Sequence, residues 1–207
     1  MTDHSIACML VTHLPVKAEV RRYTQLQGKP VIITESYGSK DLVLDSSAEV
    51  KGVTAGMPLA EAMSRCKDAS LIQADAPYYN DTFDKMIKAL ELRSPAVEKD
   101  GLGCAYVGLE GLDMMYGGEA QVIASLLQVS PAEFNPRVGV ARGKFPAYVA
   151  AITTQGGRAT RIPCDPASMA AFLNGLSIGL LPLSWANKTR LHRFGIHTLD
   201  QFGRDDN

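Results

Sequence analysis

Short apolar runs alternate with segments of helical period along most of the chain. Residues 6–12 (IACMLVT) form a short apolar run, which is typical of a buried strand. In 77–93, Phe83, Met86 and Leu90 recur at helical spacing and predict an amphipathic helix. The other expected strands are 28–36, 40–45, 70–75, 96–100, 103–110, 137–143 and 159–163, and the other expected helices are 16–27, 58–66, 117–130, 144–157, 165–176, 184–196 and 197–203.

The order of these elements indicates the fold class. Strands and helices mix without a strict alternation up to about residue 163, and only short helices follow Asp165. This order predicts an α+β protein, in which a mixed sheet has helices on one face and a small helical subdomain follows. We expect the junction near residues 163–168.

Composition and charge exclude some classes of protein. The 207 residues include 21 basic and 22 acidic side chains, so the net charge is -1. A wholly basic packaging protein is therefore excluded, although a local basic face is not. Cys8, Cys66, Cys104 and Cys164 show no CxxC spacing, so no zinc or thioredoxin-like site is indicated.

The N-terminal sequence bears on location. It has no basic stretch before an apolar core, so it does not read as a signal peptide. No apolar run approaches the roughly 20 residues that a membrane span needs. We expect a cytoplasmic protein with reduced thiols and without a membrane partner.

Four stretches, in order, resemble motifs of the Y-family (translesion, UmuC/DinB-like) DNA polymerases. They are GVTAGMPLAEAMSRCKD (52–68), SPAVEKDGLGCAYVGLEGL (94–112), VGVARGKFPAYVAAI (138–152) and LPLSWANKTRLHRFGIHTLDQFG (181–203). The resemblance implies a palm at 1–27 and 74–164, a fingers insertion at 28–73 and a helical thumb at 165–207. By this resemblance, we expect the 207 residues to lack the family's little-finger domain.

The same resemblance places the metal ligands of the family. Nucleotidyl transfer uses two divalent metals held by carboxylates, and magnesium prefers such hard oxygen ligands. The family's D-x-D pair falls on Leu10 and Thr12, and its D-E pair falls on Gly103 and Cys104. None of these side chains supplies a carboxylate, so we expect no catalytic residue, no bound metal and no cofactor.

The nucleotide contacts are replaced as well. The tyrosine and the arginine that contact the triphosphate in the family fall on Ser46 and Glu49, and a lysine falls on Tyr148. A glutamate in this position would repel a triphosphate. We therefore expect no nucleotide-binding residues at these positions.

Some basic residues remain as candidates for contact with nucleic acid. Lys144 matches a lysine of the third motif, although a solvated lysine at a helix start is the alternative. In the thumb segment, Lys188, Arg190 and Arg193 are basic, and positions 190 and 193 share a helix face. Phosphate contact and an ordinary basic surface both remain open for these residues.

These replacements make the chain most similar to the ImuB type, which keeps the polymerase fold without its metal site. That similarity implies an adaptor in DNA-damage-induced mutagenesis, translesion synthesis and DNA repair. DNA is a candidate partner, and an error-prone replicative polymerase and the sliding clamp would bind through regions beyond this chain. Two alternatives remain: an active polymerase with a relocated metal site, using Asp45 or Glu110, and a DNA-binding module without partners.

Overall fold

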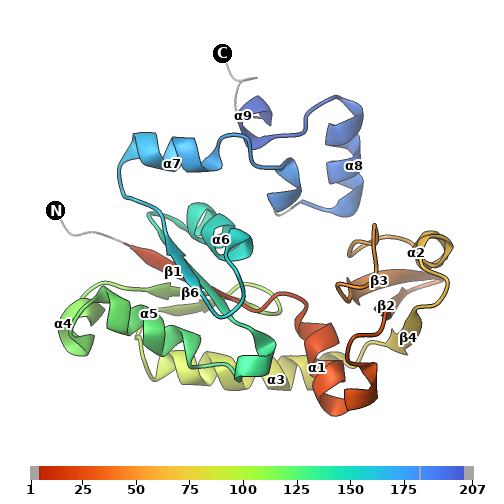
Figure 1. Cartoon of the computed structure of the whole chain (residues 1–207), viewed down its shortest axis with the longest axis horizontal. Coiled ribbons are helices and arrows are strands. Elements are labelled where there is room, and N and C mark those ends of the chain that lie inside the picture. The colour runs from red at the N-terminus through yellow and green to blue at the C-terminus, as the bar shows by residue number, and fades with distance from the viewer. Residues whose placement is uncertain (1–4, 182, 203–207) are drawn as a thin grey trace. The chain divides into compact units, whose positions relative to one another are not determined.

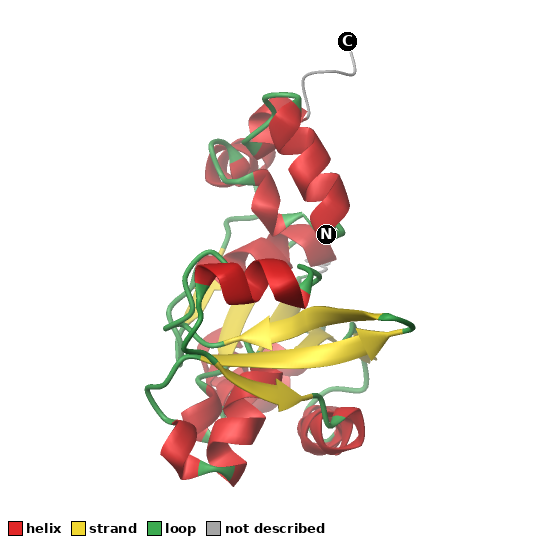
Figure 2. Ribbon diagram, turned by 90° about the vertical axis from the view of Figure 1, so that its right-hand side faces the viewer, coloured by secondary structure: helices red, strands yellow, loops and turns green. Residues whose placement is uncertain are grey.

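The computed structural model describes residues 5–181 and 183–202 (Figures 1 and 2). The strands of these residues are β1 (Ile6–Leu10), β2 (Val31–Tyr37), β3 (Lys40–Ser46), β4 (Ser70–Gln73), β5 (Val97–Lys99), β6 (Cys104–Gly108), β7 (Arg137–Ala141) and β8 (Ala159–Arg161). The α-helices are α1 (Leu14–Arg22), α2 (Leu59–Arg65), α3 (Ala76–Glu91), α4 (Leu112–Tyr116), α5 (Glu119–Leu127), α6 (Lys144–Thr153), α7 (Pro166–Leu173), α8 (Trp185–Arg193) and α9 (Leu199–Phe202). The described residues also form 3₁₀ turns at Thr24–Leu26, Ala132–Phe134 and Ile178–Leu180.

The chain forms two compact units. The first comprises the residues up to Thr12, Phe83–Leu181 and the residues from Phe194 on, and the second comprises His13–Thr82 and the segment that ends at Arg193. The division of the chain into palm, fingers and thumb stays a prediction. Positions 1–4, 182 and 203–207 of the predicted palm and thumb lie outside the described residues.

A five-stranded mixed sheet organises the first unit. Its strand order is β5-β6-β1-β7-β8, with β7 and β8 parallel and the other neighbours antiparallel. The apolar run of β1 lies at the centre, where both neighbours supply hydrogen bonds. This position explains why the run lacks polar alternation, since a central strand covered on both faces needs apolar residues on each.

Helix α6 covers one face of this sheet by close backbone approach (Figure 1). Cys8 and Leu10 of β1 are buried on that face together with Ala147 and Ala150 of the helix. Gly139 of β7 makes the approach possible, because a Cβ there would overlap the backbone of α6. Residues of the opposite face are buried as well: Ala7, Met9, Val107, Val138 and Val140.

The second unit is built around a three-stranded sheet, in the order β3-β2-β4. β2 pairs with β3 antiparallel and with β4 parallel, so this sheet is mixed too. Its apolar cluster joins the sheet to α2 and to the glycine-rich loop before it. The buried members of the cluster are Ile32, Val43, Val50, Val53, Met57, Ala62 and Ala69.

The predicted α+β class is confirmed, and each expected strand is present. Most of the expected helices are shorter than predicted, by three or more residues in α1, α5, α6, α7 and α8. Tyr23 and Thr154 end α1 and α6, and Gly118 precedes the first residue of α5. The short helix α4 was not predicted, since its five residues lie between glycines and show no helical period. No helix of the described residues is long and apolar enough to cross a membrane.

Candidate nucleotide and nucleic-acid site

The positions at which the motif resemblance predicts the family's metal ligands lie on two paired strands. The Cα atoms of Leu10 and Cys104 are direct partners in the antiparallel pair of β1 and β6. One residue further along β1, the Val11 N–H donates to the Gly103 carbonyl at 2.7 Å. The first unit therefore brings three of the four positions, Leu10, Gly103 and Cys104, together at one end of these strands.

This end of the strands is apolar where a metal site would be charged. Leu10 is 6% exposed and Cys104 is 8% exposed, and both belong to one buried cluster with α6. The Cys8 and Cys104 sulfur atoms are 3.7 Å apart in this cluster. Their hydrogen bond and burial raise the pKa of the Cys8 thiol, so Cys8 stays protonated at neutral pH.

Tyr148, at the position where the resemblance predicts the family's lysine, adds an aromatic ring to the same cluster. Tyr148 lies on α6 and packs against the cluster as a partly buried side chain. Burial raises the pKa of its phenol, as it does for Tyr106 on β6. A neutral tyrosine offers no positive charge to a phosphate, so this site lacks a cation as well as carboxylates.

The described residues contain no group of three or more His, Cys, Asp or Glu side chains that could hold a metal ion. Thr12, the remaining ligand position, is half-buried just after β1 and provides a hydroxyl rather than a carboxylate. A two-metal centre needs several hard anionic ligands. The residues at these positions therefore do not fit the magnesium ions of nucleotidyl transfer.

The fingers positions lie in the second unit. Ser46 is buried at the end of β3, whereas Glu49 is exposed in the loop that follows. A hydrogen bond from Ser47 holds the pKa of the Glu49 carboxyl below its usual range, and Lys51 adds to this effect. Glu49 is thus an anion at neutral pH, which opposes the binding of a triphosphate here.

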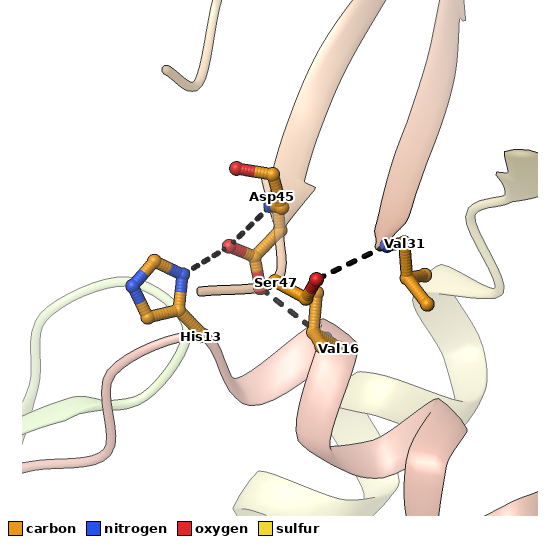
Figure 3. Close-up of polar contacts among 6 residues, drawn as sticks. His13, Val16, Val31, Asp45 and Ser47 are labelled. Carbon is orange, nitrogen blue, oxygen red and sulfur yellow. Dashed lines mark hydrogen bonds and ion pairs between the residues drawn. The ribbon is translucent and has the colours of Figure 1, made fainter. Parts of the chain in front are cut away.

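Asp45, one of the two residues considered for a relocated metal site, is engaged in hydrogen bonds (Figure 3). One carboxylate oxygen accepts from His13 Nδ1 at 2.7 Å and from the Ser46 N–H at 2.9 Å. The other oxygen accepts from the Val16 N–H at 3.2 Å, at the first turn of α1. These bonds show that Asp45 caps the first turn of α1. Glu110, the other residue considered as a ligand of a relocated metal site, is exposed in the first unit.

The basic candidates differ in their surroundings. The Lys144 ammonium donates to both carboxylate oxygens of Glu98 at 2.6 Å, so its charge is largely neutralised. Lys188, Arg190 and Arg193 lie on α8, with Arg190 and Arg193 exposed in its last turn. Burial lowers the pKa of Lys188. The two arginines are three residues apart and share one face of the helix.

A sequence profile described as the impB/mucB/samB family matches residues 11–152, which is more than half of the chain. The chain belongs to this family. The family is that of the Y-family DNA polymerases, so the resemblance seen in the motifs is confirmed at this level. The assignment to the ImuB type within the family stays a prediction.

Individual relatives agree with the family. The DNA polymerase IV of Dehalococcoides mccartyi is 28% identical over 190 residues, covering 89% of this chain and 48% of the relative. The DNA polymerase IV of Staphylococcus aureus is 26% identical over 211 residues, covering 99% of this chain and 57% of the relative. The chain thus spans about half the length of the curated relatives it matches.

Solved structures of the family share the fold of this chain. DinB from Sulfolobus solfataricus superposes with a TM-score of 0.75 at 22% identity, over 97% of this chain and 60% of the other. A structure titled as the insertion ternary complex of Dbh DNA polymerase gives 0.73 at 21% identity, over 97% and 61%. These similarities confirm the Y-family fold.

Several contacts of this site were not found from the sequence. The Cys8–Cys104 pair depends on the register of β1 and β6, and 96 positions separate the two residues in the chain. The bonds of Asp45 to His13 and of Lys144 to Glu98 likewise join distant segments. The only signal in the sequence was that Cys8 and Cys104 both lie in predicted strands. That signal was not enough, because two cysteines on paired strands meet only when the strands pair in the correct register.

Proposed function

We propose that this chain is part of a non-catalytic Y-family homologue that acts as an adaptor in DNA-damage-induced mutagenesis and translesion synthesis. The observation that supports it best is the pairing of Leu10 with Cys104 in a buried apolar cluster. The family's chemistry needs metal-bound carboxylates at these positions. A sheet face packed with apolar side chains cannot hold two hydrated dications, since burying charge without ligands is strongly unfavourable.

An adaptor of this kind would still bind DNA. The relatives are named DNA polymerase IV, and solved structures with this fold are titled as polymerase complexes. The exposed arginines of α8, Arg190 and Arg193, supply the positive charge that phosphate contact requires. The error-prone replicative polymerase and the sliding clamp are the proposed protein partners, bound through regions beyond this chain.

Primer extension tests the absence of catalysis. The full-length protein is incubated with a primed template and the four deoxynucleotides, first with magnesium and then with manganese, beside an active DNA polymerase IV. We expect no templated incorporation under either condition, and a DNA-binding measurement on the same preparation verifies that the protein is folded. Robust templated incorporation would overturn the proposal and favour an active polymerase with a relocated metal site.

The adaptor role has a separate test. The full-length protein, bound to primed DNA, is mixed with the purified replicative-type error-prone polymerase or the clamp, and complex formation is measured by sedimentation. Co-sedimentation with either protein supports the adaptor. DNA binding without either partner would instead favour a DNA-binding module.

A further inference from the structure

A pocket of about 500 Å³ opens on the first unit, lined by residues from the end of β6 to α5. Figure 1 labels β6, α4 and α5. The walls of the pocket combine apolar side chains, carboxylates and one hydroxyl. The lining residues used below are Ser5, Glu110, Asp113, Met114, Glu119 and Val122. None of them belongs to the positions that correspond to the family's metal or nucleotide site.

The Ser5 hydroxyl is the first feature that indicates a ligand. Ser5 is 6% exposed, and its Oγ is buried without a hydrogen-bond partner among the described residues. Buried hydroxyls are normally satisfied, so an unsatisfied one on a pocket-lining residue indicates a hydrogen-bond partner that the described residues do not supply.

The carboxylates of the pocket are the second feature. Glu110 and Asp113 are exposed at its edge, and the Asp113 side chain has no ion-pair partner within the described part of the chain. Glu119 also lines the pocket and forms an ion pair with Arg161. The Asp113 carboxylate therefore adds a negative charge to the edge of the pocket, near a buried hydroxyl, which favours a cationic ligand.

The apolar wall indicates that the ligand has a hydrocarbon part. Met114 is 88% exposed and its neighbour Met115 is 78% exposed on the short helix α4. Methionines adapt their shape to a partner and are common at protein-binding surfaces. Val122 of α5 adds a buried apolar side chain to the wall.

We propose that this pocket binds a basic segment of a partner protein through a lysine or arginine side chain. The cation donates to Ser5 Oγ and to the carboxylates of Glu110 and Asp113, and its methylene stem packs on Met114. A bare metal ion is disfavoured, because no group of three metal-binding side chains occurs among the described residues. The carboxylates repel nucleic acid, so the segment belongs to a protein.

The position of the pocket makes it independent of catalysis. β1 and β6 run from the Leu10–Cys104 pair at one end to the Ile6–Gly108 pair at the other. The pocket lies at the second end, next to Ser5 and the end of β6. The four residue steps from Leu10 to Ile6 correspond to roughly 13 Å at the usual rise of about 3.3 Å per residue. A bound segment therefore leaves the apolar cluster undisturbed.

Fluorescence anisotropy of a labelled peptide tests the proposal. The probe is a short peptide of arginine, lysine and leucine, titrated with the full chain at low ionic strength. Its control has citrulline and norleucine in place of the basic residues. We expect the double variant Glu110→Gln/Asp113→Asn to bind about five- to ten-fold more weakly, which corresponds to two exposed ion pairs. The variant Glu91→Gln removes an exposed charge outside the pocket and should bind as the unmodified chain does.

Ser5→Ala provides a second measurement that does not depend on charge. It removes a hydroxyl that makes no hydrogen bond within the described residues, so we expect weaker peptide binding with an unchanged thermal midpoint. Equal binding by the double variant and by Glu91→Gln would overturn the proposal. Equal binding of the citrulline and norleucine peptide would overturn it as well, since the contact would then be apolar only.

Discussion

The sulfur atoms of Cys8 and Cys104 lie 3.7 Å apart on neighbouring strands, beneath helix α6. Cys104 also faces Leu10 directly across the strand pair. Both contacts are apolar or weakly polar, so this end of the sheet is stabilised by packing rather than by charge. The motif resemblance predicts metal-bound carboxylates of the family at these positions, whereas the side chains of this chain form an apolar contact there.

We expect Cys104→Asp to destabilise the protein. A carboxylate at this position would be buried beside Cys8 without a cation, so we expect the free energy of unfolding to fall by about 3 kcal/mol. Cys104→Ala is the matched control and should cost only about 1 kcal/mol, because it removes one sulfur atom. Urea denaturation at pH 7 measures both. Equal losses for the two variants would mean that solvent reaches this position.

The contact of Asp45 with α1 leads to a second prediction. Asp45→Ala removes the acceptor of His13 Nδ1 and of the Val16 N–H, and leaves the first turn of α1 without its cap. We expect a loss of about 1–2 kcal/mol in the free energy of unfolding. Asp45→Asn keeps one oxygen as an acceptor and should lose less. A lower urea midpoint for Asp45→Asn than for Asp45→Ala would contradict the capping role.

The buried phenol of Tyr79 leads to a prediction of how the free energy of unfolding changes at alkaline pH. Its hydroxyl donates to Glu19 at 2.9 Å, and both residues are buried, so burial and the neighbouring carboxylate raise the pKa of this phenol. The unfolded chain releases this proton near pH 10, whereas the folded chain retains it. The stabilisation is therefore present below pH 10 and is lost as the pH rises beyond it.

Urea unfolding from pH 9.5 to 11.5 measures this effect. We expect Tyr79→Phe to reduce the downward slope of stability against pH by up to about 1.4 kcal/mol per pH unit. Tyr37→Phe, at an exposed tyrosine, is the control and should keep the slope of the unmodified chain. An unchanged slope in Tyr79→Phe would mean that Tyr79 ionises equally in both states.

The salt dependence of DNA binding distinguishes the basic candidates. If Arg190 and Arg193 contact phosphates, the double alanine variant should reduce the slope of log K against log salt by about 2. Lys144→Ala should leave the slope unchanged, because Glu98 holds that ammonium with both oxygens. Mobility shifts over a range of salt concentrations measure all three proteins. A smaller slope for Lys144→Ala would show that DNA displaces Glu98.

The sequence predicted strands well because apolar runs such as 6–12 and 137–143 have few other readings. It did not predict helix α4, because a segment of five residues between Gly111 and Gly117 is too short to show the helical period of apolar positions. The motifs predict that Leu10 and Cys104 replace carboxylates of the family, and this stays a prediction. Their close packing was not predicted, because it depends on strand register and on the approach of α6.

That approach yields the last prediction. A Cβ at Gly139 would overlap the backbone of Ala147 and Ala151, so α6 would have to move away from β7. We expect Gly139→Ala to cost about 3 kcal/mol or more, since overpacking against backbone cannot be relieved by a rotamer change. Gly108→Ala is the graded control: its Cβ would lie 3.0 Å from the Ala96 Cβ, on the facing strand segment.

Ala96 can shift by a few tenths of an ångström, so Gly108→Ala should cost less. Urea denaturation measures the two stabilities. A larger loss of stability in Gly139→Ala than in Gly108→Ala is the expected result. Equal stability of the two variants would mean that α6 is not held against β7 by this glycine, and the apolar packing of Leu10 and Cys104 would then need another cause.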